Sequence, residues 1–294
     1  KADGITLLDY WIESISGTTP NQLATVWIEF DSIGTSATTF YMYYGNVSAT
    51  SLSNGDNTFP FFDDFSTTFN DPVKWTGDTG DFSVTDGILT GTAGKFLYGN
   101  VYVSGDLCLR IRGLFHDQNN EGVSLVGEDD AYNCYQNNGS SNHSEWQVTN
   151  DNYAHYTIFS NTPLGFGNYH IYELARITTG TDTVYGRVDD NVSWLSCASY
   201  VPTADLRVRL RQGIHVDYVF IRHYNPTEPT WGTWGAEEYD VSFTTESAVA
   251  SATMDGIIPI ESTTESAEAT DTFDGDILRD SFTESAEASD TFGS

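Results

Sequence analysis

Short runs in which apolar and polar residues alternate make up most of the chain. Residues 107–112 and 206–211 alternate cleanly, with apolar side chains on one face and cationic side chains on the other. This two-residue period is that of a β-strand with one buried face. Runs rich in β-branched and aromatic residues predict further strands at 5–13, 23–31, 39–44, 169–177 and 214–224. Residues 82–90 predict a hairpin, because Asp86 and Gly87 supply the positive φ of a tight turn.

Turn signals every 8–15 residues favour an all-β fold, an antiparallel β-sandwich or jelly roll. Residues 54–56 mark a turn, and four phenylalanines, a proline and two aspartates follow at 58–65. This aromatic stretch separates a shorter strand-rich segment from a longer one. We therefore predict a small β domain at 1–59, a jelly-roll domain at 60–239 and an acidic repeat tail at 240–294. A length of 294 residues allows about two domains with cores of their own.

The last part of the chain is an internal repeat. A motif that begins Thr-Glu-Ser-Ala starts at Thr245, Thr264 and Thr283, which are 19 residues apart. Twelve acidic residues and one basic residue, Arg279, follow position 244. Composition alone favours disorder, whereas the alternation that leads to Phe273 has the period of a strand. We expect a repetitive β tail.

The N-terminal segment resembles a known family. The motifs at 7–13, 26–29, 40–46 and 48–51 are similar to domain-of-unknown-function family 2341, which occurs in surface and secreted proteins. The resemblance implies a concanavalin-like jelly roll next, opening on Phe-Asp-Asp-Phe as at 62–65 and closing on a strand like 216–224. It extends to about residue 238. Strands that the family carries earlier are missing here, which implies an open sheet edge. The tail is similar to Glu-Ser-Ala-x-Ala-Ser-Asp repeats of archaeal surface proteins and environmental virus proteins.

The composition limits the partners. The formal net charge is −30, which disfavours binding to a phosphate backbone, so we expect no nucleic-acid partner. No apolar run reaches the roughly 18 residues of a membrane span. Three cysteines do not make a disulfide framework, and buried thiols are the simplest interpretation. The chain begins at Lys1, so we expect it to be processed or part of a longer protein.

The sequence shows no recognisable catalytic motif. Concanavalin-like glucanases carry alternating acids on one strand, and no Glu-x-Asp-x-Glu motif is present. Gly-x-Ser-x-Gly and His-Glu-x-x-His are also missing. We therefore expect the protein not to be an enzyme, and no cofactor to be required.

Clustered carboxylates suggest a structural calcium ion. Asp63, Asp64, Asp117 and Glu121 supply the hard oxygen ligands that calcium prefers. Solvated acidic turns are the alternative, because calcium needs 6–8 oxygens that converge in space.

Two tryptophans suggest a sugar-binding platform. Trp231 and Trp234 flank Gly232 and Thr233 near the end of the predicted jelly roll. Their rings could stack on a pyranose ring. The alternatives are a staple that closes the sandwich or a contact with the tail.

Arginines on strand faces suggest an assembly surface. Arg110, Arg112, Arg207, Arg209 and Arg211 are five of the 12 basic residues. A salt-bridged, solvated face is one interpretation. The other is that an acidic strand, such as a tail repeat of a neighbouring copy, docks on Arg207, Arg209 and Arg211, with Phe273 and Phe292 as its anchors.

Together these features predict a structural protein of a cell surface, extracellular filament, surface layer or virus particle. Its partners would be copies of itself, because an open sheet edge accepts a further strand. The alternative is a carbohydrate-binding adhesion module with the repeats as a stalk.

Overall fold

The structure is a computed structural model of the 294-residue chain. It describes residues 7–18, 22–34, 36–43, 48–66, 73–92, 94–114, 122–128, 133–139, 143–149, 156–163, 167–190, 193–211, 213–227, 253–255 and 272–274. The chain divides into two compact units, Lys1–Thr230 and Trp231–Ser294. The predicted boundaries after residues 59 and 239 stay predictions.

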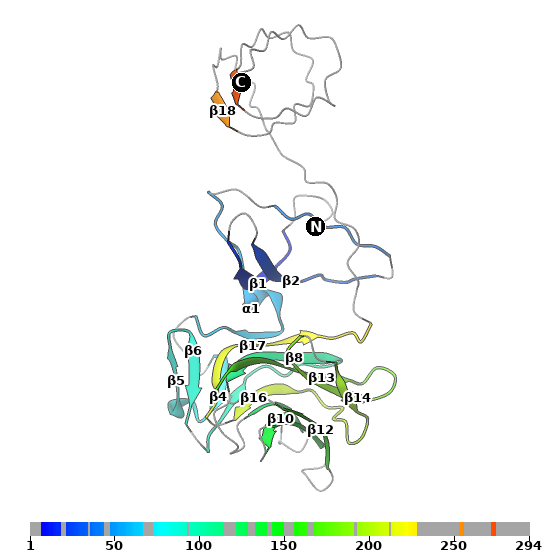
Figure 1. The fold of residues 1–294 in the computed structure, drawn as a ribbon. Helices are drawn as coiled ribbons and strands as arrows, with labels where there is room; N and C mark the ends of the chain where they lie inside the picture. The colour runs from blue at the N-terminus through cyan, green and yellow to red at the C-terminus, as the bar shows by residue number, and fades with distance from the viewer. Residues whose placement is uncertain are drawn as a thin grey trace. The chain divides into compact units, whose positions relative to one another are not determined.

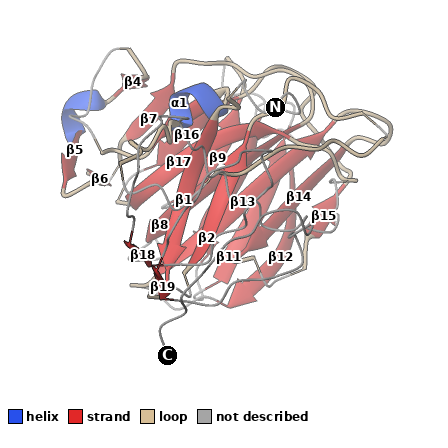
Figure 2. Cartoon of the chain, turned by 90° about the horizontal axis from the view of Figure 1, so that it is seen from above, coloured by secondary structure: helices blue, strands red, loops and turns tan. Residues whose placement is uncertain are grey.

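The first unit contains a jelly roll of two antiparallel sheets, which lie one above the other in Figure 1. The fold is the predicted all-β, concanavalin-like sandwich, and strands make up nearly all of its regular structure (Figure 2). The seven-stranded sheet has the order β12-β11-β10-β9-β16-β7-β4, with β4 at Trp75–Gly77, β7 at Phe96–Gly99, β9 at Gly122–Val126, β10 at Asn133–Gly139, β11 at His143–Thr149, β12 at Tyr156–Pro163 and β16 at Arg207–Arg211.

The eight-stranded sheet has the order β15-β14-β13-β8-β17-β6-β5, and β3 pairs with β17 beside this path. Its strands are β3 Phe61–Asp63, β5 Phe82–Thr85, β6 Ile88–Gly91, β8 Leu107–Leu114, β13 Tyr169–Ile177, β14 Thr183–Val188, β15 Leu195–Cys197 and β17 His215–His223, and a 3-10 helix, η1, spans Thr79–Asp81. In the part of the chain that the structure describes, no helix is long and apolar enough to cross a bilayer.

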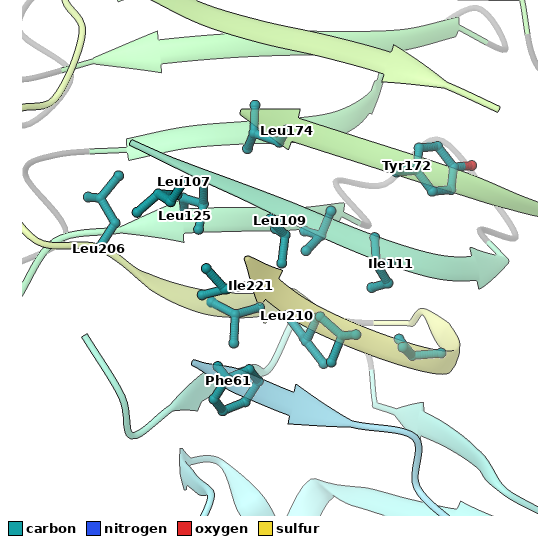
Figure 3. Packing of buried hydrophobic residues seen from close by; sticks show 14 of the residues in the cluster. Phe61, Leu107, Leu109, Ile111, Leu125, Tyr172, Leu174, Leu206, Leu210 and Ile221 are labelled. Carbon is teal, nitrogen blue, oxygen red and sulfur yellow. The ribbon is translucent and has the colours of Figure 1, made fainter. Parts of the chain in front are cut away.

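The main core lies between the two sheets. Every second residue of a strand points inward, so Leu109 of β8 meets Leu210 of β16 and Ile221 of β17 in one cluster (Figure 3). All three side chains are fully buried. Burying a leucine or isoleucine contributes about 1.5–3 kcal/mol, so the alternation seen in the sequence supplies most of the driving force for this sandwich.

One glycine permits a close approach of the sheets. A Cβ atom on Gly186 of β14 would overlap the indole of Trp146, which β11 contributes from the opposite sheet and which is fully buried. A larger residue at position 186 would therefore push the sheets apart.

The N-terminal segment forms a hairpin of β1 (Tyr10–Ser16) and β2 (Leu23–Ile28), followed by the short helix α1 (Gly55–Thr58). Trp11 and Trp27 pack against Phe220 on the outer face of the eight-stranded sheet. The turn predicted at 54–56 is instead the start of α1, because the Asn54 side chain accepts a hydrogen bond from the Asn57 amide and caps the helix.

The aromatic stretch 58–65 divides between two clusters. Phe61 and Phe65 belong to the main core, where both rings pack near Trp75. Phe59 and Phe62 belong to the second cluster, beneath the hairpin. The alternation of a strand sends neighbouring rings to opposite sides, so this stretch joins the hairpin to the jelly roll.

Most predicted strands are present. The strands predicted at 107–112, 169–177, 206–211 and 214–224 correspond to β8, β13, β16 and β17, and the hairpin turn has positive φ at Asp86 and Gly87. The strand predicted at 39–44 is wrong for the described residues 39–43, where Tyr41, Met42 and Tyr43 are exposed. Aromatic content alone does not make a strand without a partner to pair with.

The second unit is described at two strands, β18 (Thr253–Asp255) and β19 (Thr272–Asp274). They pair in parallel, whereas the other described strand pairs are antiparallel.

Candidate functional site

Three arginines and three aromatic rings lie on the outer face of the seven-stranded sheet, where Arg207 and Arg211 are half-buried and Arg209 between them is only 5% exposed. We call this group the arginine–aromatic face, and it comprises Phe96, Tyr98, Tyr102, Arg207, Arg209 and Arg211. Arg207 lies 4.7 Å from the ring centroid of Tyr98 and 4.9 Å from that of Tyr102. Arg209 and Arg211 lie 5.5 and 5.7 Å from the centroid of Phe96. These distances are those of cation–π contacts.

The local sequence explains this placement. In β16, Val208 and Leu210 are fully buried in the core, so the three arginines point to the opposite face. The register sets Arg209 opposite Tyr98 of β7 on one side and Ser124 of β9 on the other. Arg209 donates a hydrogen bond of 3.2 Å to the Ser124 hydroxyl. The sequence analysis predicted the arginine row but not its aromatic neighbours. The alternation of Phe96 and Tyr98 with Leu97 was the available signal that these two rings share one face of a strand.

A different set of arginines lies on the outer face of the eight-stranded sheet. We call Glu13, Arg110, Glu173, Arg187 and Asp190 the Arg110 network. Arg110 donates from Nε to Glu13 at 2.9 Å and from Nη1 and Nη2 to the two oxygens of Asp190 at 2.8 and 3.0 Å. Glu173 lies 3.3 Å from Arg110 and also pairs with Arg187. These cations therefore have carboxylate partners.

Glu13 connects this network to the hairpin. Its carboxylate accepts hydrogen bonds from Arg110, from the Tyr218 hydroxyl and from the Trp27 indole at 2.8 Å. The Glu13 and Arg110 side chains are each only 4% exposed. Burial and the charge of Glu13 raise the pKa of Tyr218 well above its ordinary value. The hydrogen bonds from Arg110 lower the pKa of Asp190.

A cavity of about 350 Å³ lies beside the network, between the hairpin and the eight-stranded sheet. Asp190 and Asp217, two of the acids at this cavity, are paired with Arg110 and Arg112. Its lining consists of Glu13, Ser14, Thr25, Arg110, Arg112, Ile171, Asp190, Asp217 and Tyr218. These charged groups pair with one another, so we interpret the cavity as part of the contact between the hairpin and the eight-stranded sheet.

The predicted metal ligands do not converge in the described chain. Asp63 accepts hydrogen bonds from the Trp75 indole at 2.7 Å and the Phe65 amide at 2.8 Å, and burial raises its pKa. Asp64 accepts from the Ser66 amide and hydroxyl. Asp117 and Glu121 lie outside the described residues, within which no group of three or more His, Cys, Asp or Glu could hold a metal ion. A structural calcium ion stays a prediction.

The other predicted site residues are placed only in part. Phe273 lies in β19, and Trp231, Trp234 and Phe292 lie outside the described residues. Cys108 and Cys197 are buried free thiols, as expected for the cysteines that the structure describes.

Comparison with known proteins finds one family model at the N-terminal end of the chain. Residues 1–78 match the family model "Domain of unknown function (DUF2341)". No curated protein matches the chain.

The jelly roll is similar to solved structures at low identity. A β-glucanase of Bacillus licheniformis is 13% identical, with a TM-score of 0.43, over 56% of this chain and 98% of that one. A pseudo β-1,3-glucanase of Mycobacterium tuberculosis is 12% identical, with a TM-score of 0.43, over 57% and 99%. The Emp47p carbohydrate recognition domain is 10% identical, with a TM-score of 0.41, over 56% and 95%.

The prediction that the chain is not an enzyme is contradicted by these similarities, since the similar structures also include a lichenase from a mouse hindgut metagenome and a glycosyl hydrolase family 16 protein of Mycobacterium smegmatis, besides the Bacillus licheniformis glucanase. The prediction rested on a missing motif. A missing Glu-x-Asp-x-Glu run excludes one arrangement of acids on one strand, but acids from different strands can also meet on a sheet face. The similar structures also include a pseudo β-1,3-glucanase and a carbohydrate recognition domain, so likeness of fold alone does not assign an activity.

Proposed function

We propose that this is an extracellular or surface-exposed protein whose jelly roll binds an acidic polysaccharide on the arginine–aromatic face. The observation that carries the proposal is the row Arg207, Arg209 and Arg211, in which each guanidinium lies over an aromatic ring of the same sheet face. The likeness of the fold to carbohydrate-binding proteins supports the same class of ligand.

The geometry of the face suits a linear, charged chain of sugars. Alternate residues of a strand are about 6.8 Å apart, so the half-buried Arg207 and Arg211 lie two such steps apart along β16, on either side of the buried Arg209. A guanidinium donates in parallel to both oxygens of a carboxylate or sulfate group. The rings of Phe96, Tyr98 and Tyr102 add flat apolar area on which a sugar ring can stack.

The net charge of −30 restricts where such a ligand can bind. A polyanion is repelled by most of the surface, but at 0.1 M salt this repulsion is screened beyond about 10 Å. The arginine row supplies the local positive charge. We therefore expect binding to need moderate salt, to be specific for this face and to weaken again at high salt.

The test compares binding to uronate-rich, sulfated and neutral polysaccharides by isothermal titration calorimetry. Arg207→Gln with Arg211→Gln should reduce affinity for the acidic polymers by about 100-fold, at roughly 1.4 kcal/mol for each contact. The control is Lys95→Gln, which removes one cation that is not part of the face and that pairs with Asp81. Release of reducing sugar is followed in the same samples, because hydrolysis is the activity of the similar glucanases. Equal binding by the double variant and the wild type would refute the proposal.

A second candidate function is assembly through strand-mediated contacts between copies into a filament, surface layer or virion appendage. The observation that favours it is the hairpin of β1 and β2, a sheet of two strands in the described chain. Trp11 and Trp27 face the jelly roll, so Ile12 and Val26, which are paired in register, face the other way. Ile15, which is opposite Ala24 on the face of Val26, is 57% exposed, and Leu23, on the face of Trp27 at the end of β2, is 76% exposed. A strand of another copy that pairs with an edge of this sheet would extend it and add side chains beside these residues.

Light scattering of the full chain tests assembly. Ile15→Lys with Leu23→Lys should reduce the mass of the particles, and the control is Thr85→Lys, at an exposed position of β5 in the jelly roll. Assembly that persists unchanged in the double variant would count against the hairpin as the contact surface.

A further inference from the structure

Two β-bulges border one cavity. In the pairing of β1 with β2, the register shifts between Ile12 and Ser14, so Glu13 is an extra residue of β1. In the pairing of β17 with β8, the register shifts between Val216 and Tyr218. A bulge re-aims side chains, and bulges are over-represented next to active sites. Both bulged strands line the cavity of about 350 Å³ between the hairpin and the eight-stranded sheet.

The bulges bring consecutive polar residues to this cavity. Val216 belongs to the main core, whereas Asp217 and Tyr218 both line the cavity on the other face of the sheet. In the hairpin, Glu13 and Ser14 both line it. Strict alternation would send one member of each pair to the opposite face. Two irregularities of strand pairing therefore contribute to the lining of the same cavity.

The cavity has a buried floor and an exposed rim. The side chains of Glu13, Arg110 and Tyr218 are buried. At the rim, the side chains of Arg112 and Asp217 are 40% and 34% exposed. A ligand can therefore enter from solvent and reach groups that are held in place by the sheet. Ligand pockets measure about 300–1,000 Å³ and are frequent where two parts of a fold meet, so this one has room for one small ligand.

The charges that line the cavity are paired. Arg110 pairs with Glu13 and Asp190, and Arg112 pairs with Asp217. Three carboxylates against two guanidinium groups leave a formal charge of −1 on the lining, which disfavours an anion. Each of these carboxylates already has a guanidinium partner, so an ammonium ligand would have to displace one. The cavity therefore suits a neutral ligand.

The rim keeps hydrogen-bonding capacity that suits hydroxyl groups. Ser14 and Thr25 are exposed and lie opposite each other on the two strands of the hairpin. A carboxylate has about four lone-pair sites and a guanidinium has five N–H donors, so the pair of Asp217 and Arg112 can bond further groups. Ile171 adds a half-buried apolar side chain. A sugar ring carries hydroxyl groups and apolar C–H surface in the same combination.

We propose that this cavity binds a small neutral polyol of the size of one sugar residue. The hydroxyl groups of the ligand donate to Asp217 and accept from Arg112, and the hydroxyls of Ser14 and Thr25 contact it from the hairpin. The ligand therefore bridges the hairpin and the jelly roll. The proposal does not rest on the arginine–aromatic face, which lies on the other sheet and whose proposed ligand is an anion.

Ligand-observed NMR on the full chain tests the proposal, with glucose, galactose and mannose as probes. We expect saturation transfer to at least one of these sugars and a Kd on the order of 1–10 mM, because one sugar unit makes few contacts. Glucuronate and glucosamine place a negative or a positive charge on a similar ring, and both should bind more weakly. The affinity for the neutral sugar should not depend on salt, in contrast to the binding of a polyanion.

Two substitutions at the rim provide the variants. Asp217→Asn removes an acceptor oxygen and should raise the Kd about tenfold, and Thr25→Val removes a hydroxyl at nearly constant shape and should raise it about fivefold. Thr85→Val, at an exposed position of β5, is the matched control. Arg207→Gln with Arg211→Gln should bind the sugar as the wild type does, which separates this site from the arginine–aromatic face.

Three results would overturn the proposal. The first is the absence of saturation transfer to all three neutral sugars, and the second is tighter binding of glucuronate or glucosamine. The third is an unchanged Kd in both rim variants, which would place the sugar outside this cavity. Thr25 is exposed on the hairpin, so Thr25→Val is expected to fold even if Asp217→Asn does not. Failure of the polysaccharide test leaves each of these outcomes unaffected.

Discussion

The two sheets of the jelly roll carry arginines with the same sequence pattern in different surroundings. Arg110 alternates with buried leucines along β8, as Arg209 alternates with Val208 and Leu210 along β16. Arg110 has three carboxylate partners and lies beneath the hairpin. Both arginines are buried and lie over an aromatic ring, Trp27 for Arg110 and Phe96 for Arg209, but Arg209 donates to the Ser124 hydroxyl. The difference shows that alternation fixes which way an arginine points, whereas the neighbouring strands fix what it does.

Substitution in the Arg110 network should have the largest effect on stability. Arg110→Ala leaves the buried carboxylate of Glu13 without its cation and removes one of the cations of Glu173, and breaking a buried ion pair costs about 3–5 kcal/mol. Glu13→Ala should be similar in size. Urea unfolding followed by tryptophan fluorescence measures both. Because the two side chains act together, the double variant should cost less than the sum, and an additive result would contradict the network.

Cys108 of β8 is buried on the same face of the eight-stranded sheet, so the rate at which its thiol is labelled measures how well that face is covered. Burial raises the pKa of its thiol to about 12. The thiolate at pH 8 is then roughly a thousandfold rarer than for an ordinary cysteine, and labelling should be slow to a similar degree. Mass spectrometry of iodoacetamide-treated protein, with and without urea, gives the rate at each cysteine. Native labelling of Cys108 as fast as in urea would show that the hairpin side of this sheet is open.

Asp190 should give the network a pH dependence of a defined sign. The pKa of Asp190 in the folded protein lies below the unfolded value of about 3.9. Its contribution to the free energy of unfolding is therefore fully present above that pH and is lost as the pH falls through the folded pKa. Asp190 is half exposed, so Asp190→Asn should cost only about 1 kcal/mol at pH 7. The difference from the wild type should disappear in acid. Asp182→Asn is the control, and a deficit that is independent of pH would contradict the assignment.

Substitution on the arginine–aromatic face should have a smaller effect on stability than substitution in the Arg110 network. Arg207→Ala removes cation–π contacts with Tyr98 and Tyr102, each of which contributes about 0.5–1 kcal/mol at an exposed site. We expect a loss of about 1–2 kcal/mol in urea unfolding. A loss as large as that of Arg110→Ala would remove the contrast between the two faces and favour a structural role for this row.

The sequence by itself determined most of the strands, their inward and outward residues and the 19-residue repeat, because these depend on a two-residue period and on local identity. It also singled out the aromatic stretch at 58–65, where the domain boundary stays a prediction. Only the tertiary structure decided that Phe61 and Phe62 serve different clusters, and that Glu13 reaches Arg110 across 97 positions of the chain. Contacts of that kind depend on which strands become neighbours, and strand order is set by the packing of the whole sandwich rather than by any short pattern.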